Sequence, residues 1–154
     1  MTAAVWGKNE LLQTLNEPDA YVALTFEIPG VPKPYAAAKK GRTGWYDPRA
    51  EVKENARWYL KAQYSDEPIR RAVKVGFTFE MPIPKSWPKW KKKEARSGEL
   101  LHETKPDIDN LIKLYMDCLK KIVIRDDNQV WKLSPAPVKK YSDNPKTIIW
   151  VQEA

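Results

Sequence analysis

Two pairs of aspartates between residues 105 and 130 are the side chains of this sequence most able to do chemistry together. Asp107 and Asp109 stand where a helix is expected to begin, and Asp126 and Asp127 follow its expected end. Carboxylates brought close together repel one another unless a cation lies between them. Because the whole chain has a formal net charge of +7, the pattern predicts a metal ion held against a bound polyanion.

Two interpretations are open for Asp107 and Asp109. A lone aspartate at a helix start usually caps it, since its side chain accepts backbone N–H groups and its charge suits the helix dipole. The second acidic pair favours a metal site instead. The link over residues 121–125 is short and apolar, and the strand after it is expected to return alongside the helix, so Asp127 could approach Asp107 and Asp109.

The donors of such a site would be carboxylate oxygens, with His102 as the only imidazole in the chain. Oxygen donors suit Mg²⁺, with Mn²⁺ as a possible substitute, and argue against zinc. Mg²⁺ often links one or two carboxylates to a substrate phosphate, which indicates phosphodiester hydrolysis. His102 could be a general base, but a lone histidine is more often structural.

Lys113 lies one helical turn beyond Asp109 on the same face. It could form an ion pair with Asp109 that contributes about 0.3–0.5 kcal/mol. Alternatively, its ammonium could point at a scissile phosphate and stabilise the charge that develops in the transition state. The spacing alone does not choose between these two roles.

Two basic segments with interleaved aromatic residues could contact a nucleic-acid backbone and stack on exposed bases. Trp45 and Tyr46 follow the first segment, and Trp87 and Trp90 interrupt the second. Both segments could also be solvated loops whose tryptophans pack on the domain. Together with a metal site they favour DNA, and the residues expected to bind it are Lys39, Lys40, Arg42, Lys85, Lys89, Lys91, Lys92, Lys93, Arg96 and Lys105.

Apolar residues that alternate along the chain predict the strands that must position these side chains. The closing strand is apolar without interruption over residues 148–151, so it could be buried on both faces. A weaker strand precedes it and is ended by prolines. The four predicted strands cover residues 21–28, 72–81, 129–138 and 146–152.

Helical spacing predicts two amphipathic helices, over residues 48–64 and 107–121. Asp47 is expected to be the N-cap of the first, with Pro48 at its first position. Residues 29–44 are too rich in proline and lysine for regular structure, and residues 81–101 are expected to be a long connection. The order β-α-β-α-β-β predicts one α/β (α+β) domain, with a mixed sheet of about four strands packed against two main helices.

Composition narrows the class of protein. The pI near 9.4 favours a nucleic-acid partner, and the single cysteine, Cys118, excludes an internal disulfide and a cysteine-based zinc site. Cys118 falls towards the apolar side of its helix and is expected to be buried. No stretch has the ~20 apolar residues of a membrane span or the pattern of a signal peptide. We therefore expect a soluble cytoplasmic protein with no membrane partner and no small-molecule cofactor.

Three stretches together resemble the signature of the RusA family of Holliday-junction resolvases. They are KPDIDNLIK at residues 105–113, MDCL at 116–119 and RDDNQV at 125–130. The first strand with its proline-rich basic loop, YDP at 46–48 and MPIPKSW at 81–87 resemble the phage-associated branch of this family, so the resemblance covers about residues 22–151. Residues 1–20 do not resemble the usual start of the family. We interpret them as an N-terminal extension of unknown role before a RusA-like endonuclease domain over residues 21–154.

The resemblance implies a homodimer that cleaves four-way DNA junctions with Mg²⁺ during recombination and repair. The essential aspartates of the family fall on Asp107, Asp109 and Asp127, and its essential lysine falls on Lys113. Asp126 matches an adjacent acidic position that would support the metal ligands.

The reaction implied is a pair of symmetric nicks that leave 5′-phosphate and 3′-hydroxyl ends, which suits a two-fold dimer with two identical sites. It also implies a bacterial or phage-encoded protein that works at the nucleoid. Two alternatives stay open: a metal-dependent nuclease acting on other branched DNA, such as flaps and forks, and a non-catalytic basic DNA-binding protein.

Overall fold

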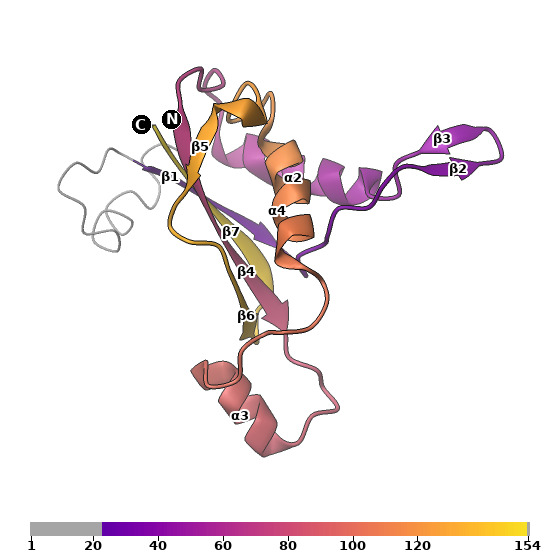
Figure 1. Cartoon of the computed structure of the whole chain (residues 1–154), viewed down its shortest axis with the longest axis vertical. Coiled ribbons are helices and arrows are strands. Elements are labelled where there is room, and N and C mark those ends of the chain that lie inside the picture. The colour runs from indigo at the N-terminus through magenta and orange to yellow at the C-terminus, as the bar shows by residue number, and fades with distance from the viewer. Residues whose placement is uncertain (1–22, 154) are drawn as a thin grey trace.

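A mixed β-sheet runs through the computed structural model, which describes residues 23–153 of the chain. The sheet has five strands in the order β1-β7-β4-β5, and β6 also pairs with β4. β1 and β4 are antiparallel to β7, whereas β5 and β6 run parallel to different parts of β4. The elements, shown in Figure 1, are β1 (Ala23–Pro29), β2 (Lys39–Gly41), β3 (Gly44–Tyr46), α2 (Ala50–Gln63), β4 (Val73–Pro82), α3 (Lys89–Ser97), α4 (Ile108–Leu119), the 3₁₀ helix η2 (Asp127–Gln129), β5 (Val130–Leu133), β6 (Val138–Ser142) and β7 (Lys146–Glu153).

One hydrophobic core joins the sheet to α2 and α4. Along β4, Phe77 and Phe79 are fully buried while Thr78 between them is only half-buried, which is the alternation that the sequence predicts. Leu60 of α2 and Leu111 of α4 are buried against the same core. Each large apolar side chain buried in this way stabilises the fold by about 1.5–3 kcal/mol, so the core fixes α4, and the acidic residue at its start, relative to the sheet.

The predicted α+β class and the mixed sheet are confirmed. The helices predicted over 48–64 and 107–121 correspond to α2 and α4 to within two residues at each end, the usual uncertainty of helix limits. The N-cap residue of α2 is Arg49, so the prediction that Asp47 is the N-cap and Pro48 the first helical residue is wrong. Asp47 lies three residues before the start of α2, and its carboxylate accepts the backbone N–H of Arg49 at 2.8 Å. The extension expected over residues 1–20 lies outside the described residues.

The prediction that β7 is buried on both faces is wrong, because only one face of the strand is buried. Thr147, Ile149 and Val151 are buried, but Ile148 and Trp150 between them are only half-buried. Antiparallel neighbours on both sides satisfy the backbone of β7, while α2 and α4 share the core on the buried face.

The segment predicted to lack regular structure over residues 29–44 contains most of a β-hairpin. β2 pairs with β3 from Lys39↔Tyr46 to Gly41↔Gly44, and Gly44 has φ +131°, a conformation that favours glycine. The hairpin projects away from the sheet and helices (Figure 1). Its strands have three residues each, which is too short for a hydrophobic alternation to reveal them.

The connection predicted over residues 81–101 contains the helix α3. Pro88 precedes its first residue, and Gly98, with φ +86°, ends it in the left-handed conformation. Proline before a helix and glycine after it are its normal boundaries. The high lysine content of this segment hid the helix, since Ala95 is its only buried residue.

The single strand predicted over residues 129–138 is two strands, β5 and β6. Between them, the chain crosses β4 at Gly76, where an added Cβ would lie 2.5 Å from Pro135 Cδ. Ser134 donates its backbone N–H to Val75 O at this crossing. Only glycine lets the two backbones approach so closely, so the division of this strand depends on a tertiary contact.

Cys118 is fully buried on the inner face of α4, as predicted. Burial raises the pKa of its thiol to about 11, so the reactive thiolate is scarce at neutral pH. We expect iodoacetamide at about pH 8 to leave Cys118 unmodified in the folded protein and to alkylate it fully after unfolding in guanidinium. Intact-mass spectrometry measures both, and alkylation of the folded protein at the rate of a free cysteine would contradict this burial.

Among residues 23–153, no helix combines the length and the apolar character needed to cross a bilayer.

Candidate catalytic and nucleic-acid-binding site

Asp107 and Asp109 lie at the first turn of α4, as predicted. Asp107 is the N-cap residue, with extended backbone angles, but its side chain makes no capping hydrogen bond. Its Oδ1 instead lies 3.5 Å from the ammonium of Lys105. Among residues 23–153, the carboxylate of Asp109 accepts only the backbone N–H of the next residue, Asn110, at 2.9 Å. The side-chain capping interpretation is therefore wrong, and both carboxylates are left facing solvent.

Neighbouring segments hold this end of α4 in place. Lys139 of β6 donates from its ammonium to Thr104 O at 2.8 Å and to Pro106 O at 2.9 Å, immediately before Asp107. The backbone N–H of Tyr35 donates to Asn110 O at 2.8 Å. The acidic pair is thus presented from a rigid helix end, which is a better support for a reactive site than a free loop.

Lys113 lies one turn further along α4. Its ammonium is 3.9 Å from the centroid of the Tyr35 ring, a cation–π contact. Within the described residues it forms no ion pair with Asp109. The alternative of an Asp109–Lys113 ion pair is therefore wrong, and an exposed cation stands beside the acidic pair.

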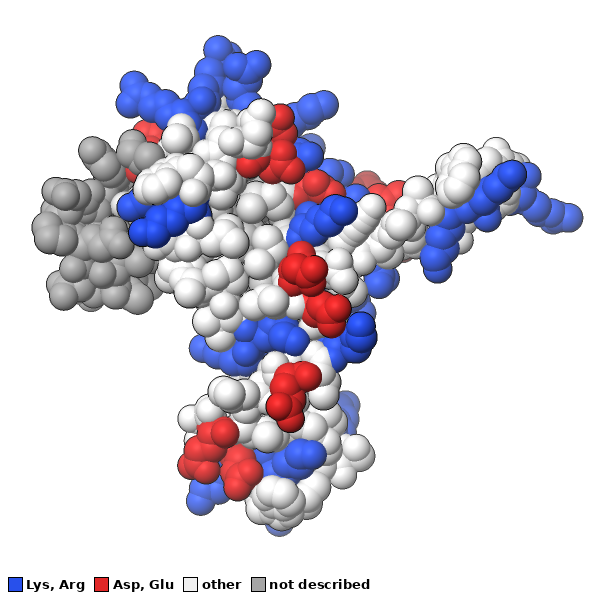
Figure 2. All heavy atoms as spheres, in the orientation of Figure 1, with Lys and Arg blue, Asp and Glu red and all other residues white. Residues whose placement is uncertain are grey.

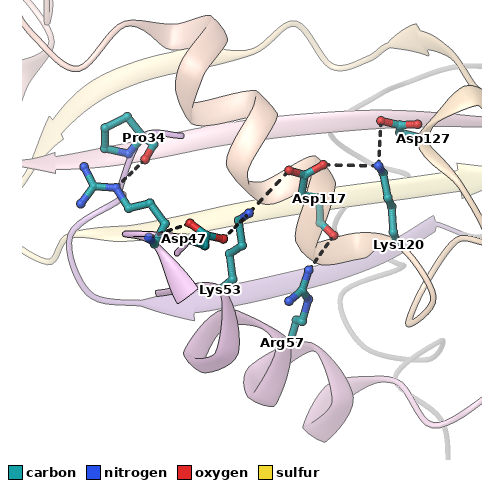
Figure 3. A network of polar contacts seen from close by, with 8 residues as sticks. Pro34, Asp47, Lys53, Arg57, Asp117, Lys120 and Asp127 are labelled. Atoms are coloured by element: carbon teal, nitrogen blue, oxygen red, sulfur yellow. Dashed lines mark hydrogen bonds and ion pairs between the residues drawn. The ribbon is translucent and has the colours of Figure 1, made fainter. Parts of the chain in front are cut away.

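Asp127 starts the 3₁₀ helix η2 after the C-terminal end of α4. Asp126 caps this helix, because its carboxylate accepts the N–H of Asp127 at 2.8 Å while Gln129 Oε1 accepts the N–H of Asp126. Lys120 Nζ lies 3.4 Å from Asp127 Oδ2 and 3.4 Å from Asp117 Oδ1 (Figure 3). A hydrogen bond with Asp126 and the nearby Lys120 lower the pKa of Asp127, so Asp127 is ionised at neutral pH.

Within one chain, Asp127 does not join Asp107 and Asp109. The twelve residues of α4 separate the two acidic groups, a helix length of about 18 Å. Of residues 23–153, no three His, Cys, Asp or Glu side chains are grouped so that they could hold one metal ion. The expected approach of Asp127 to the first pair is therefore wrong for a single chain, because the strand that returns along the helix begins only after Asp127.

The donor set at the start of α4 nevertheless suits Mg²⁺. Asp107 and Asp109 offer two exposed carboxylates without His or Cys donors, and Mg²⁺ commonly uses one or two carboxylates together with waters and a substrate phosphate. Their positions two residues apart keep their Cα atoms within about 7 Å of each other. The pair therefore fits part of a magnesium site, whose other ligands would come from water, from DNA or from a second chain.

The basic residues predicted to bind DNA divide between two outlying elements and the start of α4. Lys39, Lys40 and Arg42 lie on the β2–β3 hairpin, where Trp45 is 72% exposed, so Trp45 does not pack on the domain. Figure 2 shows the cations of this hairpin along a narrow projection. The cations of the second basic segment lie on α3 or just before it. Lys105 lies beside Asp107. In α3 the guanidinium of Arg96 is already paired, at 2.7 Å from Asp143 Oδ2.

A further group of cations was missed from the sequence. Two adjoining clefts, one between α2 and the end of α4 and the other beside η2, share Lys120 and Lys121. Three of the cations recur every four residues on α2, so helical spacing could have placed them on one face; the others are distant in sequence. The group consists of Lys53, Arg57, Lys61, Arg70, Lys120, Lys121 and Arg125, which we call the basic groove.

An exposed acidic pair with an adjacent lysine, in a basic α+β domain, is typical of enzymes that cut phosphodiesters. The sequence profile of the family described as endodeoxyribonuclease RusA matches residues 26–152, so this chain belongs to the RusA family of endodeoxyribonucleases. The match confirms the resemblance to the RusA family noted in the sequence, and it does not test the phage-associated branch.

A relative from Bacillus subtilis (strain 168), the "Uncharacterized protein YqaN", is 38% identical over 88 residues. The alignment covers 56% of this chain and 58% of that protein. It therefore spans less than two thirds of the relative.

Proposed function

We propose that this protein is a Mg²⁺-dependent endonuclease that resolves four-way DNA junctions by paired symmetric nicks in recombination and repair. The observation that carries the proposal is the pair Asp107 and Asp109, exposed at the first turn of α4 with no side-chain capping hydrogen bond from the N-cap residue Asp107. Membership of an endodeoxyribonuclease family supports it. The same proposal includes a bacterial or phage origin and a location at the nucleoid, where the DNA junctions are.

Asp107 and Asp109 would hold Mg²⁺, or Mn²⁺ in its place, and Asp127 with the support of Asp126 would complete the ligands. A bound Mg²⁺ lowers the pKa of water and offsets charge on the phosphate. Lys113 would add positive charge beside the scissile phosphate. The position of its ammonium over the Tyr35 ring, one helical turn from Asp109, supports this role. No small-molecule cofactor is needed for this chemistry.

We further infer that the site is completed by a second subunit. One chain keeps Asp127 a helix length from Asp107 and Asp109, so Asp127 of the partner subunit is the source that leaves the fold of each chain intact. A two-fold dimer would then form two identical sites, which suits two symmetric nicks. Lys120 holds Asp127 in place through the ion pairs that connect it to Asp117 and Lys53 (Figure 3).

The test of this function is a nicking assay on labelled four-way junctions with Mg²⁺, in which both strands are mapped. Paired nicks at symmetric positions, abolished by chelation with EDTA, are expected. Three-way, flap, fork and linear substrates at the same salt distinguish the alternatives. If flaps or forks were cut faster than four-way junctions, they would be the substrate in place of the junction. Binding without product under any divalent cation would indicate a non-catalytic DNA-binding protein.

Trp45 is expected to stack on an unpaired base near the branch point. Trp45→Ala should weaken junction binding about tenfold, because one base–aromatic stack contributes ~1–3 kcal/mol. Its Tm should not change, since the side chain is 72% exposed. Fluorescence anisotropy of labelled junction and linear duplex measures the effect. The matched control is Trp58→Ala, which removes an exposed tryptophan of α2, away from the hairpin. Equal losses on junction and duplex would contradict stacking on unpaired bases.

The basic groove is expected to hold DNA phosphates. Lys61→Gln and Lys121→Gln should each lower the slope of log Kd against log salt by about one, the effect of losing one phosphate contact. Both side chains are exposed, so the fold should tolerate the change. Lys146→Gln is the matched control, because its ammonium is paired with Glu27 at 3.4 Å. A slope that stays constant in both groove variants would place the DNA elsewhere.

A further inference from the structure

A cleft of about 600 Å³ lies beside the segment that leads into Asp107. Its walls come from the segment after β1, the start of α2, the link from β4 to α3, β6, and residues 102–106. This volume is within the ~300–1,000 Å³ typical of sites for small organic groups. The side chains that decide its chemistry are Lys33, Arg49, Trp87, His102, Lys105 and Tyr141.

One wall of the cleft is aromatic. The rings of Trp87 and Tyr141 pack edge to face with centroids 5.2 Å apart, and the ring of His102 lies 4.7 Å from that of Tyr141. The ammonium of Lys91 lies 4.1 Å from the centroid of the Trp87 ring. These contacts fix the rings before a ligand arrives, while Trp87 stays only half-buried. Aromatic surfaces of this kind stack on nucleobases regardless of sequence.

The rim of the cleft is basic. None of the described residues that line it is acidic. Arg49 is held by a hydrogen bond from Nε to Pro34 O at 2.9 Å, and Lys33 has no ion-pair partner in the part of the chain that the structure describes. An aromatic wall below a cationic rim is complementary to a flat base that carries a phosphate.

We propose that this cleft receives one unstacked nucleobase of the strand being cut, with an adjoining phosphate at the basic rim. The proposal rests on the proposed function. Lys105 and Pro106 line the cleft and directly precede Asp107, so the wall comes within about 7 Å of the Cα of Asp107. That distance corresponds to roughly two nucleotides of a duplex strand. The cleft would therefore select the nucleotide beside the cut.

This role gives the enzyme a reason to prefer branched DNA. A base that is already unpaired or poorly stacked costs less to extrude than one inside a continuous duplex. A cleft that must be filled before the phosphate reaches Asp107 and Asp109 would thus favour cutting at branch points. Contacts with the base edge would add a preference for certain nucleotides at that position.

The experiment maps the cut on a four-way junction and then replaces each flanking nucleotide in turn by an abasic tetrahydrofuran residue. Cutting by the unchanged protein is expected to fall about tenfold at one of the two positions. Trp87→Leu should slow cutting of the intact junction by a similar factor and have no further effect on the abasic one, because the same stack is already missing. Cutting indifferent to both abasic positions, or losses that multiply, would overturn the proposal.

Two variants keep folding separate from stacking. Trp87→Phe retains a ring and should recover most of the rate, with Tm measured for every variant. Trp90→Ala removes an exposed tryptophan of α3 that does not line the cleft, so its effect should be equal on intact and abasic junctions. If Trp87→Phe is as slow as Trp87→Leu while both remain folded, the stacking role is excluded.

A binding measurement separates this proposal from the proposed function. In an Asp109→Asn background, the junction Kd is compared with and without abasic substitution of the branch-point nucleotides. The substitution should raise Kd about tenfold when Trp87 is present and not in Trp87→Leu. If the protein nicks no junction, the proposed function fails, and this Kd comparison alone still decides whether the cleft binds a base.

Discussion

An Asp109→Asn variant is expected to bind a four-way junction at least as tightly as the unchanged protein and to nick it about 100-fold more slowly or worse. In the part of the chain that the structure describes, the carboxylate of Asp109 makes only a local hydrogen bond to Asn110 N–H, so its loss should not disturb α4. Removing a negative charge near the phosphate reduces repulsion, which preserves or strengthens binding. The nicking rate in Mg²⁺ and the Kd of the junction are measured on the same preparation.

A matched control removes an aspartate elsewhere on the surface. Asp66 is exposed, before β4, and Asp66→Asn should leave both quantities unchanged. The same pair of measurements on Lys113→Gln should show slower nicking with only a small change in Kd. Undiminished cutting by Asp109→Asn would remove this residue from the site, whatever substrate the enzyme uses.

How much of this could be predicted depended on whether the signal was local. The apolar spacing of α4 and the alternation in β4 are local patterns, and both elements were found within two residues of their limits. β5 and β6 could not be separated in this way. Their division is caused by the passage of Pro135 over Gly76, a contact between residues far apart in the chain. The hairpin and α3 were missed because short, lysine-rich elements bury too few apolar side chains to show a period.

The residues of the candidate site also divide into those that local sequence could place and those that it could not. Asp107, Asp109 and Lys113 lie within seven residues of sequence, so their grouping at one helix end follows from helix geometry. The position of Asp127 does not, because it depends on where the chain turns after α4. The turn places Asp127 beside Lys120, at the far end of the helix. The basic groove was hidden for the same reason, since its cations extend from Lys53 to Arg125 in the sequence.

The ion pairs around Asp127 hold it at the C-terminal end of α4, away from Asp107 and Asp109 of the same chain. Lys120 is shared between Asp117 and Asp127; burial opposes its charge, but the hydrogen bond with Asp127 and the attraction of both carboxylates raise its pKa. The carboxylate of Asp127 cannot reach Asp107 and Asp109 while α4 and η2 keep their places, because the length of α4 separates them. Either Asp127 acts in the site of another subunit, or it has no part in metal binding.

Pairing two inactive variants in one dimer is expected to restore nicking, which is the second large effect. The dimer combines an Asp109→Asn subunit with an Asp127→Asn subunit, each with its own affinity tag, and is purified through both tags. If each site takes Asp127 from the partner subunit, one site collects both substitutions and the other collects none. The mixed dimer should then nick at roughly half the rate of the unchanged dimer, while each parent dimer stays inactive.

The control is a dimer that carries both substitutions in one subunit, for which shared sites predict no activity. A dimer of an unchanged subunit and an Asp109→Asn, Asp127→Asn double variant has one fully intact chain. With sites shared between subunits, each of its two sites contains one substitution, so it should be inactive. If sites were complete within one chain, this dimer would retain roughly half the activity and the first pairing would have none. The intact site of the first pairing should also cut only one strand of each junction, so it should yield single nicks in place of symmetric pairs.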